Sequence, residues 1–375
     1  MNFIPISQPS ITQKEIEYVT DAVKSGWVSS LGKYIELFEK KFAEFVGTRY
    51  AVTTSNGTAA LHLALVAHDI GPGDEVIVPD LTFIATANAV QYTGATVVCV
   101  DVEKSSLCID PCKVEAAITA RTKAIVPVHI YGHPADMVAL KLIAQRHGLV
   151  IIEDSAEAHG AEVLGQRAGS LGNCGIFSFY GNKIITSGEG GMITTDDHAL
   201  YERLCLLRDH AMSKERRYWH DLVGFNYRMT NLQAALGVAQ MERIDELLER
   251  KRQIFHTYHR LLSGHPGLRL NYEAPWAKNV YWMVCLEIDG FNGQRRDAFM
   301  QQLKQRGIDS RPYFYPISDM PMYVDADTPV AHELHQRGMN LPSYFDLDNA
   351  SIEYICETII TILGKGRLTR VLKNL

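Results

Sequence analysis

Lys183 has the surroundings that best suit covalent chemistry in this sequence. It follows the segment Phe177–Asn182 and stands just before the glycine-rich run Ser187–Gly191. A lysine among small, aromatic and apolar residues loses its proton more easily than a solvated lysine. Its neutral amine can then form a Schiff base with a carbonyl cofactor. A surface lysine after a strand has a similar local sequence, so this segment alone leaves both interpretations open.

Asp154 lies upstream of Lys183 and, with Glu153, ends the apolar run Leu149–Ile152. A buried carboxylate in that position suits the ring nitrogen of pyridoxal phosphate (PLP), because it keeps the nitrogen protonated and lets the ring withdraw electrons. The alternative is an ordinary helix N-cap, a position that also favours aspartate. Lys183 and Asp154 together predict a PLP site.

The segment Ser55–Thr58 follows a predicted strand and begins a predicted helix. Free N–H groups and the positive end of the helix dipole make such a turn suitable for a phosphate group. Gly57 lets the backbone approach the anion, and Thr58 adds a hydroxyl donor. Ser178 is a second candidate phosphate ligand, and Phe83 is a candidate for stacking on a planar ring. Each has a structural alternative: a helix cap, a backbone contact or a core aromatic.

The elements that must position these residues alternate along the first two thirds of the chain, where short β-branched runs are separated by helical stretches. Several runs are apolar throughout, as expected for strands covered on both faces. This alternation predicts a largely parallel sheet wrapped by helices, with ligands beyond the carboxyl ends of its strands. The predicted strands are Tyr50–Thr54, Glu75–Val78, Thr96–Val100, Ala124–His129, Val150–Asp154, Ile176–Phe179 and Met192–Thr195.

The last two predicted strands flank the Lys183 loop without a crossover helix, so we expect one of them to run antiparallel. Between the earlier strands the predicted helices are Ala59–His68, Ile84–Tyr92, Lys113–Ile118 and Met137–His147.

The length of 375 residues exceeds what one core normally supports, so the sequence predicts two domains. We expect residues 1–245 to form a large α/β domain and residues 246–375 a smaller α+β domain. The second part is predicted from a long helix over residues 232–259, strands Val280–Ile288 and Asp309–Tyr315, a helix near Arg296–Arg306 and a final helix from Ile352.

Charge and composition argue against several classes of partner. A net charge of −6 and a pI near 6.2 argue against a nucleic-acid or anionic-membrane surface. The seven cysteines are scattered without a CxxC pair, so we expect no metal site and reduced thiols in a cytoplasm. We also expect no signal peptide, and no apolar run is long enough to span a bilayer.

Over essentially its whole length the sequence resembles sugar aminotransferases of the DegT/DnrJ/EryC1/StrS family. The segments that carry the resemblance are Ser55–Leu65, Gly71–Pro79, Glu153–Gly160, Phe177–Lys183 and Gly188–Gly191. The resemblance implies a fold type I PLP-dependent transferase (aspartate aminotransferase-like), with a mostly parallel seven-stranded sheet in the large domain and PLP as cofactor.

The resemblance also implies a role for each site residue. Lys183 is the Schiff-base lysine and proton shuttle, Asp154 faces the ring nitrogen, and Phe83 stacks on the ring. Gly57, Thr58 and Ser178 hold the phosphate. Asn226 matches a residue that reaches the phosphate of the neighbouring subunit, which implies a homodimer with shared active sites; the alternative is an asparagine in a turn.

Glu157 departs from the glutamine that many relatives carry near the 3′-oxygen of the cofactor. Two anionic oxygens within hydrogen-bonding range repel each other, so we hypothesise that Glu157 shares or retains a proton there.

A finer resemblance concerns the family branch that aminates GDP-4-keto-6-deoxy-D-mannose at C4 to give GDP-perosamine for O-antigen and lipopolysaccharide synthesis. It implies a nucleotide-linked 4-keto-6-deoxy sugar and L-glutamate as substrates, and its matching stretches are Gly26–Ser30, Arg217–Asp221, Asn226–Asn231, Ser310–Pro312 and Asn340–Pro342. Candidate substrate contacts are cations that offset the diphosphate and aromatic rings that stack: Lys33, Arg217, Trp219, Arg311 and Tyr315.

Three alternatives remain open from the sequence. The first is the same chemistry on a UDP- or dTDP-linked keto sugar, or at C3. The second is a PLP-binding regulator without turnover, which has no need for an acid–base pair. The third is a PLP enzyme that acts on a small molecule.

Overall fold

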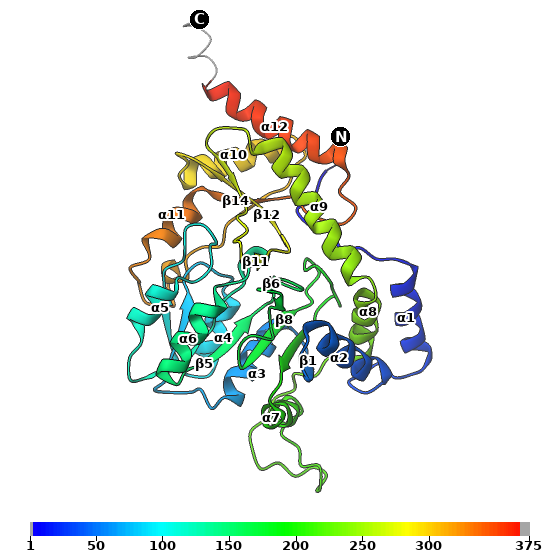
Figure 1. Ribbon diagram of the computed structural model, residues 1–375. Helices are drawn as coiled ribbons and strands as arrows, with labels where there is room; N and C mark the ends of the chain where they lie inside the picture. The colour runs from blue at the N-terminus through cyan, green and yellow to red at the C-terminus, as the bar shows by residue number, and fades with distance from the viewer. Residues whose placement is uncertain (1–2, 368–375) are drawn as a thin grey trace, which may run out of the picture.

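A twisted sheet of seven strands forms the centre of the larger part of the computed structural model, which describes residues 3–367 (Figure 1). Its order is β1-β9-β8-β5-β4-β2-β3, and only β9 runs antiparallel to its neighbours. This confirms the predicted mostly parallel sheet. The strands are β1 (Tyr50–Thr54), β2 (Glu75–Pro79), β3 (Thr96–Val100), β4 (Thr122–Ile125), β5 (Val150–Asp154), β8 (Cys174–Ser178) and β9 (Gly191–Thr195).

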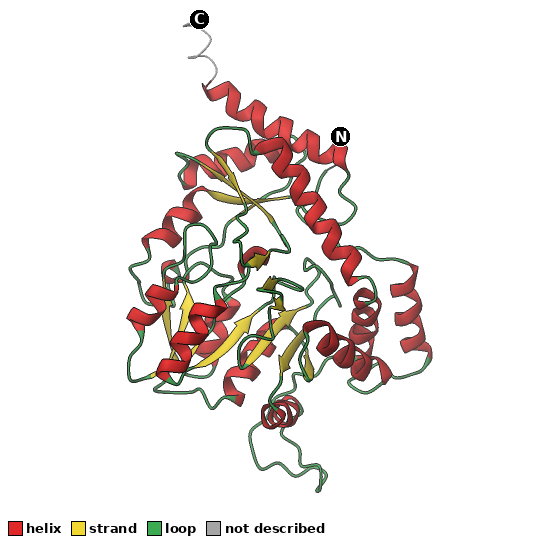
Figure 2. Cartoon of the chain, viewed as in Figure 1, coloured by secondary structure: helices red, strands yellow, loops and turns green. Residues whose placement is uncertain are grey.

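Helices cover both faces of this sheet (Figure 2). One apolar core lies under α3 (Gly57–Ala67), α4 (Ala85–Tyr92) and α7 (His198–Arg208). The other lies under α2 (Lys33–Val46), α5 (Pro111–Ala117), α6 (Met137–His147) and α8 (Asn231–Met241), with α1 (Gln13–Lys24) beside α8. Within β2, Val76 and Val78 enter the first core while Ile77 enters the second. Several strands are largely apolar because successive side chains face opposite layers that are both buried.

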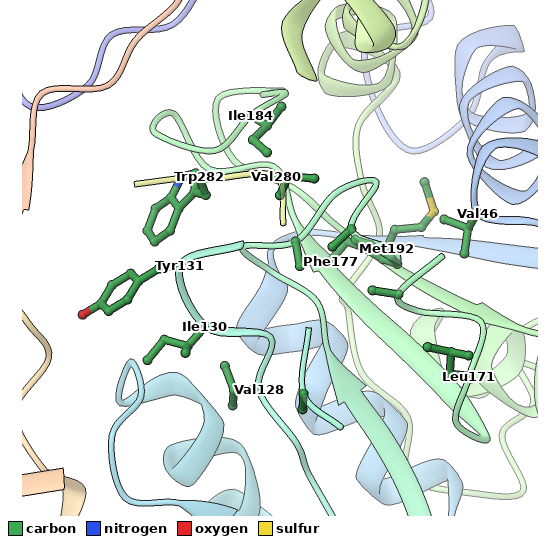
Figure 3. Packing of buried hydrophobic residues seen from close by; sticks show 14 of the residues in the cluster. Val46, Val128, Ile130, Tyr131, Leu171, Phe177, Ile184, Met192, Val280 and Trp282 are labelled. Atoms are coloured by element: carbon green, nitrogen blue, oxygen red, sulfur yellow. The ribbon is translucent and has the colours of Figure 1, made fainter. Parts of the chain in front are cut away.

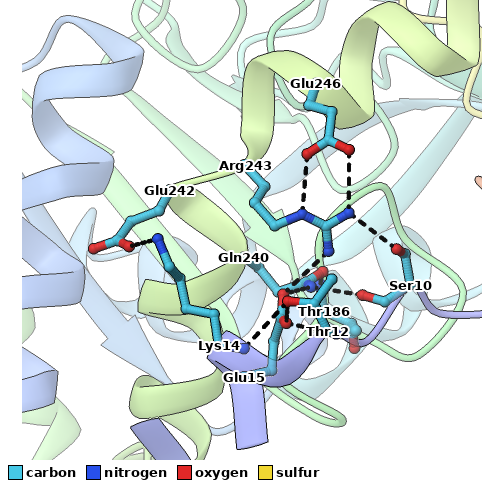
Figure 4. Close-up of polar contacts among 9 residues, drawn as sticks. All are labelled: Ser10, Thr12, Lys14, Glu15, Thr186, Gln240, Glu242, Arg243 and Glu246. Atoms are coloured by element: carbon cyan, nitrogen blue, oxygen red, sulfur yellow. Dashed lines mark hydrogen bonds and ion pairs between the residues drawn. The ribbon is translucent and has the colours of Figure 1, made fainter. Parts of the chain in front are cut away.

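The helix predicted over residues 232–259 is two helices, α8 and α9 (Ile244–Leu262), so that prediction was wrong. The break falls at Arg243, whose backbone is not helical. Arg243 bonds Glu246 and reaches Ser10 and the buried Glu15 near the N-terminus (Figure 4). The local sequence favours a helix, and contacts with the distant segment around α1 turn the chain instead.

A smaller sheet, β10-β12-β14-β13, forms the upper part of the chain in Figure 1. Its strands are β10 (Leu268–Leu270), β12 (Val284–Ile288), β13 (Arg311–Pro312) and β14 (Gly338–Leu341). A third apolar core joins this sheet to α9, α10 (Gly293–Gln305) and α12 (Asn349–Arg367), and Ile4 belongs to it. The division at residue 245 stays a prediction.

The remaining elements are short. They are β6 (Glu162–Val163), β7 (Gln166–Arg167), β11 (Ala277–Lys278), α11 (Pro329–Arg337) and two 3₁₀ turns, η1 (Ile130–Gly132) and η2 (Ile317–Asp319). No helix in residues 3–367 is both long enough and apolar enough to cross a bilayer.

Three predicted strands proved too long. The strand predicted over Ala124–His129 ends at Ile125, shortly before Pro127, which has no N–H to donate to a ladder. The strand predicted over Val280–Ile288 begins only at Val284, because Tyr281 has a positive φ of 50°. The strand predicted over Asp309–Tyr315 is limited to β13, where Pro312 again removes a donor.

Gly237 allows the close packing of α8 on α2. A Cβ atom at this position would lie 2.5 Å from the ring of the fully buried Phe38. Helix propensity alone favours Gly237→Ala by about 1 kcal/mol. We expect the clash to outweigh that gain, so that the free energy of unfolding falls by about 1–3 kcal/mol. Urea unfolding measures the change. Gly264→Ala is the matched control, since a Cβ there meets no atom within 4 Å; equal effects of the two substitutions would contradict the prediction.

Candidate active site

A cavity of about 610 Å³ opens at the carboxyl ends of β1, β5 and β8. It lies where the sheet topology predicts a ligand site. Seven of the residues proposed from the sequence line it: Gly57, Thr58, Phe83, Asp154, Glu157, Ser178 and Lys183. They come from separate segments of the chain, and the strand ends bring them together.

The turn after β1 forms an anion cradle. Asn56 caps α3, and its side chain accepts a hydrogen bond from the N–H of Ala59 at 2.8 Å. The first N–H groups of a helix have no partner within the helix, which leaves those of Gly57 and Thr58 for a ligand. A Cβ atom on Gly57 would lie 2.9 Å from the Cβ of Ser178. Glycine therefore lets the end of β8 lie against the start of α3, with the Ser178 hydroxyl beside the turn.

Asp154 is the last residue of β5 and is buried. Its carboxylate accepts hydrogen bonds from the Thr86 hydroxyl at 2.8 Å and from the N–H of Ala156 at 3.2 Å. Burial raises the pKa of Asp154, and the bond from Thr86 acts in the opposite direction. Among the described residues Asp154 forms no ion pair, so a cationic ring nitrogen would supply the charge partner that it lacks.

Glu153, the neighbour of Asp154, faces the other side of β5 and has a structural role. Its carboxylate accepts N–H groups of Gly169, Leu171 and Gly172 at 2.6–2.9 Å and pairs with His129 at 3.0 Å. Because successive side chains of a strand point to opposite sides, Glu153 has a structural role while the adjacent Asp154 lines the cavity.

Glu157 contacts the amine of Lys183. One carboxylate oxygen lies 3.5 Å from Lys183 Nζ, and the other accepts the N–H of Tyr131 at 2.8 Å. Tyr131 has a positive φ of 52°, an uncommon conformation for a large side chain. Burial raises the pKa of Glu157 to about 6, and the charge on Lys183 acts in the opposite direction.

Lys183 lies in a loop that is fixed at its base. The Lys183 N–H donates to the carbonyl of Tyr180, and the Thr186 hydroxyl bonds the Phe179 carbonyl at 2.9 Å. The N–H of Thr186 donates to the side chain of Gln240, which in turn donates to the buried Glu15 (Figure 4). The N-terminal helix α1 and helix α8 thus support the loop from behind.

Trp282 lies over the end of Lys183, with Nζ 4.0 Å from the ring centroid. Figure 3 shows Trp282 next to Tyr131, and the two rings are nearly parallel, at 16°. Tyr131 stacks in turn on Phe314, whose ring centroid lies 5.7 Å from that of Phe83. A row of aromatic side chains therefore forms one wall of the site. The exposed Phe83 ends this row and keeps a free ring surface for a planar ligand.

Six residues proposed from the sequence do not line the cavity in a single chain. Asn226 is exposed and bonds Arg228; Arg217 and Trp219 lie on the loop between α7 and α8, which extends away from the chain at the bottom of Figure 1. Lys33 pairs with Asp21, Arg311 pairs with Asp309, and the Tyr315 ring lies against His335. Their proposed roles stay predictions.

Sequence reasoning missed several residues of the site, chiefly Trp282, Phe314, Tyr131, Thr86 and Asn182. Thr86 and Tyr131 act on the two carboxylates, and Trp282 and Phe314 come from the C-terminal part of the chain. Only Asn182 had a local signal, its place beside Lys183.

The residues present fit PLP. The site offers an anion cradle, a buried carboxylate without a cationic partner, an exposed ring surface and a lysine amine around one cavity. In residues 3–367 no group of three His, Cys, Asp or Glu side chains is arranged to hold a metal ion.

Comparison with known proteins agrees with this geometry. Residues 9–360 match the profile of the DegT/DnrJ/EryC1/StrS aminotransferase family. The chain is 45% identical over 361 residues to the GDP-perosamine synthase of Escherichia coli O157:H7, with 96% of this chain and 98% of that protein covered. It is 46% identical over 365 residues to the GDP-perosamine synthase of Caulobacter vibrioides, with the same coverage. The PLP form of Streptococcus pneumoniae Spr1654 superposes with a TM-score of 0.93 at 28% identity, covering 97% of this chain and 99% of that chain.

The raised pKa of Glu157 predicts a pH effect on stability. The folded chain binds this proton more tightly than the unfolded chain, because the pKa rises from 4.5 to about 6 on folding. The resulting stabilisation is complete below pH 4.5 and is lost as the pH rises through about 6. Glu157→Gln removes it, so relative to wild type the variant gains on the order of 2 kcal/mol between pH 4.5 and 7.5. Urea unfolding of the cofactor-free protein tests this, and parallel pH profiles would refute it.

Proposed function

The chain belongs to the DegT/DnrJ/EryC1/StrS aminotransferase family, and we propose that it converts GDP-4-keto-6-deoxy-D-mannose to GDP-perosamine with L-glutamate as amino donor. It is a PLP-dependent sugar aminotransferase with the fold type I architecture. The observation that carries the proposal is the meeting of Lys183, Asp154 and the α3 turn around one cavity, in a chain 42–46% identical to three proteins named GDP-perosamine synthase.

In this proposal the residues of the cavity hold PLP in a defined orientation. Lys183 holds it covalently, Asp154 faces the ring nitrogen, and Phe83 covers one face of the ring. Gly57, Thr58 and Ser178 bind the phosphate at the start of α3, where the free N–H groups and the helix dipole favour an anion. Glu157 lies beside the 3′-oxygen and shares a proton with it, which the raised pKa of Glu157 supports.

Lys183 moves the proton in both halves of the reaction. When bound, PLP supplies a protonated ring that takes up the electron pair of the bond being broken. The amine of L-glutamate would replace Lys183 on PLP, which frees Nζ as a neutral base. Nζ would accept the proton that leaves the α-carbon of L-glutamate and give it to the PLP carbon that carries the nitrogen; water would then release 2-oxoglutarate, and the nitrogen stays on the cofactor. For the keto sugar the same amine moves a proton in the reverse direction, so that the nitrogen ends on C4 of the sugar.

GDP is the nucleotide that the comparisons favour. Three relatives at 42–46% identity carry the name GDP-perosamine synthase, and each alignment covers at least 95% of this chain. UDP- or dTDP-linked sugars, or amination at C3, are less favoured. A PLP-binding regulator without turnover is disfavoured because it has no need for an acid–base pair, whereas Lys183 and Glu157 are in contact here.

We further propose a homodimer in which Asn226 reaches the phosphate in the site of the other subunit. Its exposure, and that of the loop that carries Arg217 and Trp219, support this arrangement. Exposed apolar side chains on two segments are suited to an interface: Trp27 and Leu31 before α2, and Tyr218 and Val223 on the loop. Lys33, Arg217, Trp219, Arg311 and Tyr315 would then contact the nucleotide sugar in the assembled site.

We also propose that the product serves O-antigen and lipopolysaccharide synthesis and that the protein is cytoplasmic. The seven free thiols support a reducing compartment.

The substrate proposal is tested with purified PLP-loaded protein, L-glutamate and three acceptors: GDP-4-keto-6-deoxymannose and the UDP- and dTDP-linked 4-keto-6-deoxy sugars. We expect preferential amination of the GDP sugar at C4, identified by mass and NMR. Lys183→Ala should abolish turnover, because among the described residues no other lysine lines the cavity. Preference for another nucleotide would contradict the proposed substrate. Turnover by Lys183→Ala would contradict the role of Lys183 in proton transfer.

Shared sites are tested by subunit complementation. Lys183→Ala and Asn226→Asp are each expected to be nearly inactive, the second because its charge repels the phosphate. Co-refolded mixtures should regain about a quarter of wild-type activity, since half the dimers are mixed and each has one intact site. If Asn226 served its own subunit, every site in the mixture would carry a lesion and no activity would return.

A further inference from the structure

Trp282 occupies a position that the proposed roles do not explain. It lies between β11 and β12, in the C-terminal part of the chain, yet its buried ring lines the cavity. Lys183 Nζ lies 4.0 Å from the ring centroid, and Glu157 lies 3.5 Å from the same nitrogen. The amine is therefore placed between an aromatic face and a carboxylate.

The ring of Trp282 is held on several sides. Its Nε1–H donates to the carbonyl of Asn182, next to Lys183, at 2.8 Å. The backbone carbonyl of Trp282 accepts a hydrogen bond from Lys251 Nζ at 2.8 Å, and Lys251 also donates to the carbonyl and hydroxyl of Ser343. Tyr131 stacks on the ring from within the site. The indole cannot turn away from Lys183 without breaking the bond to Asn182 and the stacking on Tyr131, and Lys251 fixes the backbone that carries it.

Lys251 helps to fix the backbone of Trp282. It is buried, and none of the described residues supplies it with a carboxylate within ion-pair distance. Burial lowers the pKa of Lys251 to about 7. Its nitrogen donates to neutral oxygen atoms of Trp282 and Ser343, and these bonds connect the two segments. Helix α9 thereby fixes the segment that carries Trp282.

We propose that Trp282 is a platform for the Lys183 amine: its ring face stabilises the ammonium that forms when Nζ takes up a proton. The inference rests on the proposed function and deepens it. Nζ as a neutral amine gains little from the ring, whereas the ammonium is attracted to the electron-rich indole face and to Glu157.

Nζ gains one proton and gives it away again, so its charge balances over the half-reaction. The C–H bond of L-glutamate would break, PLP when bound would take up the electron pair, and Nζ would take up the proton. Nζ would then give that proton to the PLP carbon that carries the nitrogen and become neutral. Trp282 favours the charged state of Nζ between these two events.

Three variants test the platform. Trp282→Leu removes the ring face and the bond to Asn182. Trp282→Phe keeps a weaker ring face and loses the bond, and it guards against the possibility that the leucine variant does not fold. Trp276→Leu is the control, because Trp276 is a partly buried tryptophan that packs on His133 and does not line the cavity.

The first readout needs neither PLP nor sugar. The cofactor-free protein is acetylated at one fixed pH, and peptide mass spectrometry compares Lys183 with the exposed Lys141 on α6. We expect the relative acetylation of Lys183 to rise about 5-fold in Trp282→Leu, as the amine loses its cover and its ammonium is less favoured. Trp282→Phe should be intermediate, and Trp276→Leu should equal wild type.

The second readout is the half-reaction of the PLP-loaded protein with L-glutamate alone, followed by cofactor absorbance. We expect Trp282→Leu to lower the maximal rate about 10-fold and to leave half-saturation by L-glutamate unchanged within about 2-fold. Wild-type values in both readouts for Trp282→Leu, or for Trp282→Phe if the first variant does not fold, would overturn the proposal. So would a raised half-saturation with an unchanged rate, which would make Trp282 a donor-binding residue. If wild type did not react with L-glutamate, the proposed donor would be wrong, while the acetylation result would still decide the role of Trp282.

Discussion

The burial of three ionisable side chains around one cavity is the constraint on which the rest of the structure depends. Asp154, Glu157 and Lys183 are largely removed from water, so the fold must supply the partners that water would provide. Asp154 accepts hydrogen bonds from the Thr86 hydroxyl and a backbone N–H. Glu157 accepts the N–H of Tyr131 and pairs with Lys183. A carboxylate that is buried without a full set of partners has a raised pKa, and both carboxylates show this.

The sheet meets this constraint through the order of its strands. β1, β5 and β8 are parallel and end at the same edge, which brings together the α3 turn, Asp154 and Ser178. The antiparallel β9 returns the chain after the Lys183 loop, so the loop is closed at both ends by paired strands. Behind it, Thr186, Gln240 and Glu15 connect the loop to α8 and α1. The loop that carries the Lys183 amine therefore has a fixed base.

The sequence allowed prediction of the parts whose signal is local. The apolar strand that ends in Asp154, the predicted strand that contains Ser178, and the turn with Gly57 before α3 have recognisable patterns, and these residues do meet around the cavity. The break at Arg243 was not predictable, because distant contacts near the N-terminus override a sequence that favours a helix. Trp282 was not predictable for the same kind of reason. Its place beside Lys183 is set by tertiary packing, and nothing near it in the sequence resembles a cofactor site.

The late position of Trp282 in the chain has a consequence for biosynthesis. Both carboxylates and Lys183 leave the ribosome while the segment that carries Trp282, Lys251 and Ser343 is still being made. During that interval Trp282 does not yet lie over the Lys183 amine, and Phe314 does not yet line the cavity. The nascent protein therefore carries a more accessible lysine than the finished one. Docking of the C-terminal part onto the sheet is the step that places Trp282 over this amine.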